Sequence, residues 1–297
     1  MNSLEGILLV DKPCAVTSAE VVRQVKKRCA RGVRAGHLGT LDPFATGLLP
    51  VLLGQATKLA PFLNEKEKEY EGVIQLGAET DTLDRDGRII RTAPVPPLDN
   101  QRLAAIAARF TGKIQQTPPV FSALKRGGVP LYKLARSGVE IAPLAARPVE
   151  IRRLGLELAS TSTIRLSVIC STGTYVRALA RDIGAALDSA AYLAELRRIR
   201  AGNFSVDDSA PLGEIVEALE HGGPIRIVGM REALTDLVEV EVDASHAVWL
   251  RNGDWRALEG LAPPGEATFK IIAAGRLIAI ARAASDAPAS LLRVFPA

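Results

Sequence analysis

The stretch GHLGTLDPFATG, residues 36–47, limits more than any other part of this sequence what the chain can fold into. Its glycines permit positive φ angles or a close backbone approach, and Pro43 keeps the preceding Asp42 out of the right-handed helical region. The stretch therefore predicts an ordered loop that holds one carboxylate in an extended turn. No other acid lies between Glu20 and Glu65, so a local pair of catalytic carboxylates is not supported. Asp42 is then either a nucleophile or only the cap of a following helix.

The length of 297 residues is enough for one large domain, or for a catalytic domain with a small appendage. Hydrophobic residues make up 47% of the chain, yet no apolar run approaches the ~20 residues of a membrane span. The first residues, MNSLEGILLVDKP, lack the basic leader of a secretory signal. We therefore expect a globular, cytoplasmic protein that does not associate with a membrane.

The three cysteines and three histidines favour neither a disulfide framework nor a metal site, because they form no CxxC or HExxH pair. The nearest imitation of a cation loop is DTLDRDG, residues 81–87. There Asp84 and Asp86 have calcium-loop spacing, but Thr82 stands at the first ligand position. We expect no metal and interpret this stretch as a turn between two strands.

The net charge of +4 is unevenly distributed along the chain. Residues 12–34 hold seven Lys and Arg side chains against Glu20 alone, a local charge of +6. Such a run attracts a phosphate backbone. A solvated helix face explains the run equally well, so charge alone leaves nucleic-acid binding open.

Hydrophobic periodicity and turn residues predict a mixed α/β chain. Strands are expected at residues 6–13 and 162–170, and helices at residues 17–28 and 99–112. In STGTYVRALARDIG, residues 171–184, either Thr172 or Thr174 is expected to cap a third helix. Arg177 would then lie in the first turn of that helix, close to the preceding loop.

The last part of the chain has a different pattern. After the Gly-Gly-Pro at 222–224, VEVEVD alternates strictly, and TFKIIAAGRLIAIARA contains two strands around an Ala-Gly turn. HAVWLRNGDW supplies an Asn-Gly break. These features predict a small β-rich module at the C-terminal end.

Six ordered motifs carry a resemblance to a known family. They are GILLVDKP at 6–13, GHLGTLDPFATGLLPV at 36–51, KEYEGVIQLGAETDTLDRDG at 68–87, PPVFSALKRGGVPLYKLARSG at 118–138, STGTYVRALARDIG at 171–184 and ELRRIRAGNF at 195–204. Together they resemble the TruB family of tRNA pseudouridine synthases. The resemblance implies an α/β (α+β) catalytic domain over residues 1–234, with a mixed and mostly antiparallel sheet. It also implies a small β-rich, PUA-like RNA-binding domain over residues 235–297.

The family's reaction converts uridine to pseudouridine in the T-arm of tRNA, at the uridine called position 55, and it requires no cofactor. By resemblance, Asp42 is the nucleophile, and the route stays open between attack on C1′, addition to C6 and a glycal intermediate. Arg177 matches the arginine that pairs with this carboxylate, because a lone charge in a closed pocket needs a cation. Tyr70 matches the aromatic residue that stacks on the base and removes the C5 proton.

Further residues are expected to contact the RNA substrate. A base inside folded RNA must be flipped out to reach Asp42, and by resemblance His37 stacks in the space that it leaves. Leu196 matches a leucine that lines the pocket, and Tyr175 belongs to the same motif as Arg177. Lys12 and Lys125 are expected to contact phosphates.

Two other functions stay open, and we expect a monomer in each case. A guide-RNA-dependent pseudouridine synthase would share the Asp42 loop. A tRNA-binding folding chaperone would share the RNA-binding surface but not need the carboxylate. A nucleosidase is a third and more distant alternative, which release of free uracil would reveal.

Overall fold

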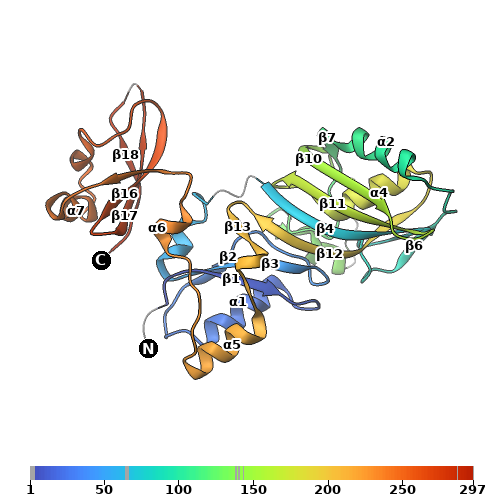
Figure 1. Ribbon diagram of the computed structural model, residues 1–297, viewed down its shortest axis with the longest axis horizontal. Coiled ribbons are helices and arrows are strands. Elements are labelled where there is room, and N and C mark those ends of the chain that lie inside the picture. Colours follow the sequence, from blue (N-terminus) through green and yellow to red (C-terminus); the bar gives the residue numbers. More distant parts are fainter. Residues whose placement is uncertain are drawn as a thin grey trace.

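A computed structural model describes residues 4–63, 67–137, 139, 141–142, 144–285 and 287–296, apart from the side chain of Trp255. A ten-stranded sheet runs through the larger part of the molecule (Figure 1). Its main path is β14 (Ala210–Pro211), β1 (Gly6–Lys12), β3 (Thr46–Leu53), β12 (Ala191–Ala201), β4 (Glu67–Leu76), β11 (Thr163–Ser171), β10 (Arg147–Leu158) and β7 (Gly112–Gln116). β2 (Ala35–His37) joins β3, and β13 (Phe204–Ser205) joins β12.

Two pairings in this sheet are parallel, β1 with β14 and β3 with β12, and the others are antiparallel. The mixed, mostly antiparallel sheet that the sequence predicted is therefore confirmed. The β3–β12 pairing matters most for the site, because it joins the loop before β3 to strands from the middle of the chain.

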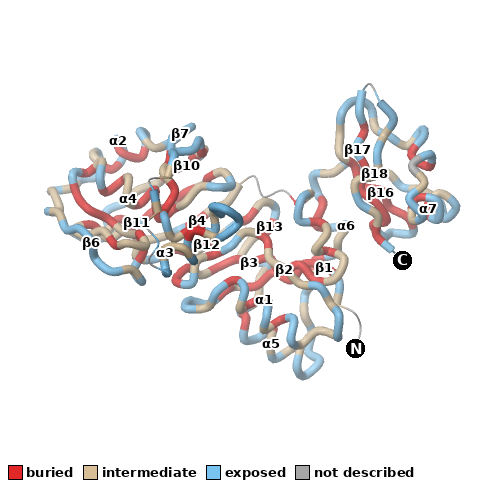
Figure 2. Tube along the Cα trace, turned by 180° about the vertical axis from the view of Figure 1, so that it is seen from behind, coloured by how far each residue is buried: buried red, intermediate tan, exposed pale blue. Residues whose placement is uncertain are grey.

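Four helices bury apolar residues in one cluster with the strands of this sheet. They are α1 (Ser18–Lys27), α2 (Asn100–Phe110), α4 (Val176–Ala186) and α5 (Leu212–His221). The packing of β1 explains its run of four apolar residues at positions 7–10. Leu8 and Val10 belong to this cluster, whereas Ile7 and Leu9 belong to a second cluster that includes residues of the C-terminal part. The strand is covered on both faces, as Figure 2 shows by its buried trace.

The C-terminal part forms a separate four-stranded sheet, which packs through Ile272, Ile280 and Phe295 into the second cluster. Its strands are β15 (Val238–Glu241), β16 (Ala267–Ala273), β17 (Arg276–Ala283) and β18 (Ser290–Val294). Helices α6 (Met230–Ala233) and α7 (Ala244–Arg251) and the 3₁₀ turn η3 (Trp255–Leu258) accompany it, whereas the 3₁₀ turns η1 (Gly54–Leu59) and η2 (Val206–Asp208) lie in the larger part. The β-rich character was predicted, but α7 was not.

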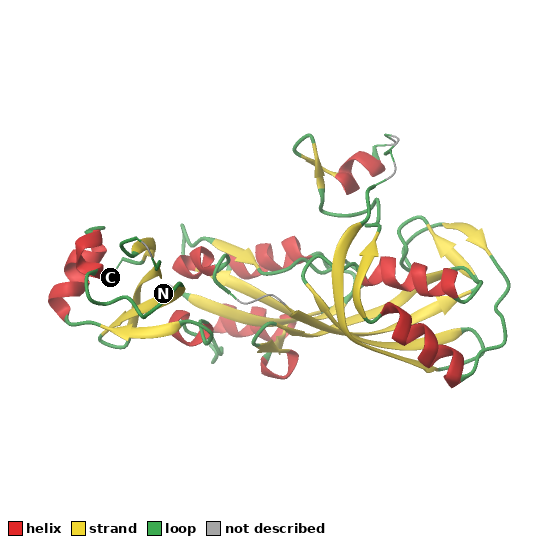
Figure 3. Cartoon of the chain, turned by 90° about the horizontal axis from the view of Figure 1, so that it is seen from above, coloured by secondary structure: helices red, strands yellow, loops and turns green. Residues whose placement is uncertain are grey.

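Two small hairpins extend from the large sheet. β5 (Ala78–Thr80) pairs with β6 (Ile89–Thr92), and β8 (Lys125–Arg126) pairs with β9 (Val129–Pro130), which leads into α3 (Leu131–Arg136). The segment of residues 122–137, here called the basic arm, projects from the sheet (Figures 2 and 3). It carries four Lys and Arg side chains and no acid.

Most of the predicted elements are confirmed. β1, α1, α2, β11 and α4 lie where the periodicity placed them, and Thr17 caps α1 by accepting from the amide of Glu20 at 3.1 Å. The predicted cap of α4 was wrong. Neither Thr172 nor Thr174 caps it, because the helix begins after Tyr175, which offers no side-chain cap. None of the helices in the described residues is long and apolar enough to cross a bilayer.

Candidate active site

The loop that carries Asp42 is held on both sides of that residue. Ser18, at the start of α1, bonds through its hydroxyl to both the amide and the carbonyl of Leu41, each at 2.9 Å. The Pro43 carbonyl accepts from the amide of Ala15 at 2.9 Å. These contacts fix the backbone next to Asp42 without using its carboxylate.

Glycine is needed where this loop enters β3. Gly47 has a φ of +98°, and it pairs in parallel register with Arg198 of β12. A Cβ at this position would lie 2.3 Å from the carbonyl oxygen of Arg198. Only a residue without a side chain therefore lets β3 approach β12 and bring the Asp42 loop to the centre of the sheet.

Arg177 and Asp42 form a bidentate ion pair across 135 residues of sequence. Arg177 Nε donates to Oδ2 at 2.8 Å, and Nη2 donates to Oδ1 at 3.2 Å. The arginine side chain is 5% exposed and the aspartate 34%, so the cation is enclosed while the carboxylate opens to solvent. Two charge-assisted bonds in a fork set the orientation of the carboxylate.

The remaining donors of Arg177 are also engaged, which the sequence did not reveal. Nη1 donates to the Thr82 carbonyl at 2.6 Å, and Nη2 donates to the Phe121 carbonyl at 2.9 Å. The buried Asp84 lies 3.4 Å from Nη1. Burial raises the pKa of Asp84, against the Thr82 hydroxyl and the Arg177 charge. Residues 81–87 are thus the turn that was predicted, between β5 and β6, and they also support Arg177.

Tyr70 and Leu196 lie in the core of the large sheet, each 7% exposed. Tyr70 is on β4, and Leu196 pairs with Gly72 of that strand. Burial raises the pKa of Tyr70 to about 12, and the charge of Asp42 adds to this rise. The charge of Asp42 also adds to the raised pKa of Tyr175 and opposes the lowering of the pKa of Lys12 by burial.

Lys12 does not lie where a phosphate could reach it, which corrects the expectation from sequence. Its side chain has no exposed surface. Its ammonium donates to the carbonyls of Pro13 at 2.8 Å, Val16 at 2.7 Å and Pro43 at 3.2 Å. Burial lowers its pKa to about 8. Lys12 instead fixes the backbone beside Asp42.

Tyr175 is half-buried directly before α4. Its backbone exchanges hydrogen bonds with the side chain of Gln116, at 2.8 Å and 3.2 Å. Burial raises the pKa of its phenol, and the charges of Arg147 and Arg177 oppose that rise. Tyr175 therefore connects the start of α4, which carries Arg177, to the end of β7.

The other predicted RNA contacts lie farther out. His37 ends β2 and is partly exposed, and Lys125 is exposed on the basic arm. The basic run of α1 is partly neutralised, since Arg23 pairs with Glu20 and Arg28 pairs with Glu220 of α5. The charge of that run is therefore smaller on the surface than the sequence suggested.

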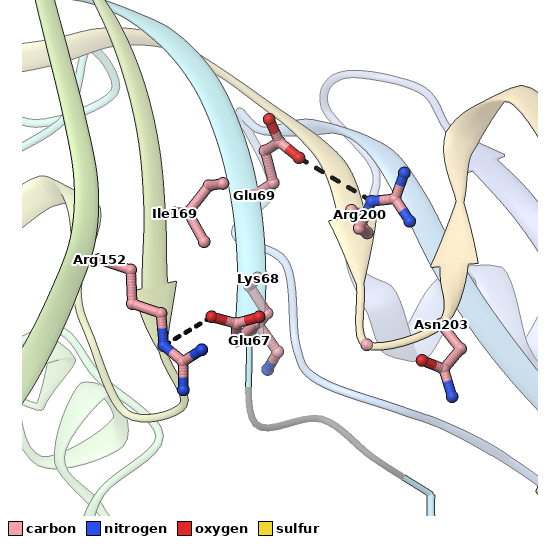
Figure 4. Close-up of a pocket in the computed structure, with 8 residues that line it drawn as sticks. Glu67, Lys68, Glu69, Arg152, Ile169, Arg200 and Asn203 are labelled. Carbon is pink, nitrogen blue, oxygen red and sulfur yellow. Dashed lines mark ion pairs between the residues drawn. The ribbon is translucent and has the colours of Figure 1, made fainter. Parts of the chain in front are cut away.

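A pocket of about 310 Å³ lies around the start of β4 (Figure 4). Its carboxylates are paired, Glu67 with Arg152 at 2.6 Å and Glu69 with Arg200 at 3.9 Å. No residue predicted for the site lines it. Within the described residues, no group of three or more His, Cys, Asp and Glu side chains could hold a metal.

Comparison with known proteins agrees with the resemblance seen in the sequence. Residues 26–176 match the family model described as TruB family pseudouridylate synthase, N-terminal domain. This range contains Asp42 and Tyr70 and ends one residue before Arg177.

Curated relatives are similar over most of their length. The tRNA pseudouridine synthase B of Aromatoleum aromaticum is 45% identical over 251 residues, which cover 84% of this chain and 80% of that protein. The tRNA pseudouridine synthase B of Geobacter sulfurreducens is 38% identical over 305 residues, covering 98% of this chain and 100% of that protein.

Solved structures show the same fold. One described as a Cbf5-Nop10-Gar1 complex superposes with a TM-score of 0.73 at 25% identity, covering 98% of this chain and 85% of that chain. An H/ACA RNP bound to a substrate RNA containing 2′-deoxyuridine gives a TM-score of 0.72 at 23% identity, with the same coverage. The match extends over both sheets, which confirms the mixed α/β fold with its β-rich C-terminal part.

Proposed function

Because this chain belongs to the TruB family of pseudouridylate synthases, we propose that it isomerises uridine to pseudouridine in tRNA, at the T-arm uridine called position 55. The target molecule follows from the names of its relatives, each a tRNA pseudouridine synthase B. The reaction breaks the C1′–N1 bond and forms a C1′–C5 bond in the same nucleotide. It needs neither redox chemistry nor hydrolysis, so a nucleophile and a proton acceptor are enough.

The Asp42–Arg177 pair carries the proposal. A nucleophilic carboxylate must be oriented, and it must be open to the substrate. Arg177 orients it through both oxygens, while a third of the aspartate side chain remains exposed. Each oxygen keeps a further lone pair for reaction. Asp42 then holds the sugar or the base while the uracil turns, by any of the three routes left open above.

Tyr70, Leu196 and Tyr175 surround the place of the flipped base in this proposal. Tyr70 stacks on the uracil and accepts the C5 proton, Leu196 lines the apolar side, and Tyr175 contacts the nucleotide from the start of α4. His37 occupies the space that the flipped uridine leaves in the base stack of the RNA. Their support is the burial of Tyr70 and Leu196 beside the Asp42 loop and the action of the Asp42 charge on both tyrosines.

The basic arm and α1 form the RNA-binding surface that we propose. Lys125, Arg126, Lys133 and Arg136 give the arm a uniformly positive charge, and Lys26 and Lys27 are exposed on α1. Phosphate contacts of this kind make binding strongly dependent on salt. The C-terminal domain, with a boundary between residues 234 and 235, adds further RNA contacts, and the enzyme works as a cytoplasmic monomer.

Stand-alone action on tRNA has more support than guide-RNA-dependent action. The curated tRNA enzymes named above are 38% and 45% identical to this chain, whereas the two ribonucleoprotein structures are 23% and 25% identical. A role in tRNA folding is compatible with the proposed activity, and the variant described next separates the two.

The test is to incubate the purified protein with unmodified tRNA transcript, without guide RNA, and to map pseudouridine by carbodiimide-dependent primer extension. Wild type should give a stop at the T-loop uridine. Asp42→Asn should lower the rate by more than about 10³-fold, because an amide is not a nucleophile. Asp188→Asn is the matched control, since Asp188 pairs with Arg102 but is 86% exposed and lies outside the site.

Three outcomes contradict the proposal. Full activity of Asp42→Asn removes the assigned nucleophile, and a stop at another uridine removes the T-arm target. Tight binding and tRNA refolding by wild type, with no pseudouridine, would replace the enzyme by the chaperone alternative.

A further inference from the structure

Arg198, on β12, is the largest completely buried side chain among the described residues. Its Nε donates to the Leu48 carbonyl at 2.7 Å, and its Nη2 donates to the Gly39 carbonyl at 3.0 Å. Its Nη1 is also buried, but it has no well-aligned acceptor within the part of the chain that the structure describes. An unused donor on a buried cation is costly and calls for an acceptor that forms during function.

The strand register places this guanidinium beside Tyr70. The two residues are direct partners across the β12–β4 pair, so their side chains leave the same face of the sheet. The charge of Arg198 and its loose hydrogen bonding oppose the burial that raises the pKa of Tyr70 to about 12. Two other groups face the phenol, Cys170 from β11 and Asp42 from its loop, and both raise its pKa further. Among these neighbours, Arg198 alone favours the ionised phenol.

The other two bonds of Arg198 connect this tyrosine to the Asp42 loop. Gly39 precedes Asp42 by three residues, and Leu48 lies in β3 directly after the loop. One rigid guanidinium therefore spans from the carbonyls that flank the loop to the phenol on β4. Lysine has a single donating centre and cannot make all three contacts in these directions.

We propose that Arg198 is a positioning residue for proton transfer, whose spare Nη1–H bonds to the Tyr70 oxygen when that oxygen is a phenolate. This inference rests on the function proposed above. In the glycosylated uracil ring, the C5–H bond breaks and its electron pair forms the C5=C6 bond. The C6=N1 electron pair returns to N1, which takes a proton from water. The proton from C5 goes to the phenolate oxygen, and the neutral Tyr70 later returns it to water.

The experiment compares wild type, Arg198→Lys and Arg197→Lys under single-turnover conditions. Arg197 is the neighbour on the same strand, and it pairs with Asp11 rather than with the site. The substrate is tRNA transcript carrying 5-deuterouridine or ordinary uridine, and the rate is followed from neutral to alkaline pH. Circular dichroism and tRNA binding show whether each variant is folded.

Arg198→Lys should slow the reaction by about 10- to 100-fold with unchanged tRNA binding, the loss of one charge-assisted bond. Its alkaline rise in rate should move to higher pH, and its deuterium isotope effect should increase because C5 deprotonation becomes limiting. Arg197→Lys should change neither readout. In a Tyr70→Phe background, Arg198→Lys should leave the isotope effect unchanged.

A uniform loss of rate, with the pH profile and isotope effect of wild type, would overturn the role of Arg198 while the proposed function stands. Absence of pseudouridine in wild type would overturn both. If Arg198→Lys does not fold, 3-fluorotyrosine at position 70 tests the phenolate with Arg198 in place. Its more acidic phenol should move the alkaline rise to lower pH, and an unmoved profile would overturn the proposal.

Discussion

Two regions next to the Asp42 loop hold buried cations in different ways. On the carboxylate side, Arg177 pairs with Asp42 and lies 3.4 Å from Asp84. On the carbonyl side, the well-aligned hydrogen bonds of Lys12 and Arg198 all go to backbone carbonyls, and neither cation forms an ion pair with a described carboxylate. Both cations of the carbonyl side have no exposed surface.

The difference separates two tasks. A carboxylate cancels the charge of its partner and is itself oriented by the pair, so the carboxylate side sets the direction of the Asp42 side chain. A carbonyl solvates a cation without cancelling its charge. The carbonyl side therefore fixes the loop backbone and leaves a positive field, which acts on Asp42 and Tyr70.

After the loss of Asp42 itself, the largest expected effect is on the carboxylate side, where Arg177→Lys removes the fork that orients Asp42. The pseudouridine-forming rate should fall by about 10²- to 10³-fold, as when one donor to a developing charge is lost. Single-turnover rates on tRNA measure this. Arg197→Lys is the matched control, because Arg197 holds Asp11 in an equally good bidentate pair, at 2.9 Å and 2.7 Å, that lies outside the site. Equal losses in both variants would show that the location of the pair has no special role.

On the carbonyl side, the buried Lys12 should make the free energy of unfolding depend on pH. Lys12 has a pKa of about 8 in the folded protein and 10.5 when unperturbed, so between these values the unfolded chain binds more protons. The free energy of unfolding of wild type relative to Lys12→Met should therefore rise as pH increases from about 8 to 10.5, by up to about 3 kcal/mol.

Urea unfolding of both proteins across this pH range tests the prediction. Lys26→Met, which removes an exposed lysine of α1, is the control and should show no such rise. A difference between wild type and Lys12→Met that stays constant with pH would mean that the buried ammonium is not costly.

The comparison also shows how much the sequence could reveal. Local patterns predicted β1, α1, β11 and α4, because hydrophobic periodicity and turn or capping residues depend only on residues that are near one another in the sequence. The resemblance brought Asp42 and Arg177 together, and the structure pairs them. The carbonyls of Thr82 and Phe121 were missed, since any residue carries a carbonyl and no pattern shows which one meets a distant guanidinium.

The burial of two charged residues, Lys12 and Arg198, was also missed. Lys12 was expected at a phosphate because it opens the basic run of residues 12–34, yet the strand that carries it is covered on both faces. Arg198 was not singled out, although a signal was present. It lies two residues after Leu196 on the same strand, so the period of two places it on the buried face. A charge at a core position of a strand is the feature that could have found it.

The smallest expected effect returns to the carboxylate side, at Asp84. Asp84→Asn should lower the pseudouridine-forming rate by about tenfold, because Arg177 loses one of its two carboxylate neighbours. Burial raises the pKa of Asp84 above that of the unfolded chain, so its ionisation destabilises the fold as pH rises through its titration range. The variant should lack this contribution. Urea unfolding from acidic to neutral pH measures it, and Asp86→Asn, at an exposed position of the same turn, is the control. Wild-type activity in Asp84→Asn would show that Asp42 and the two carbonyls hold Arg177 without it, and the carboxylate side would then reduce to a single pair.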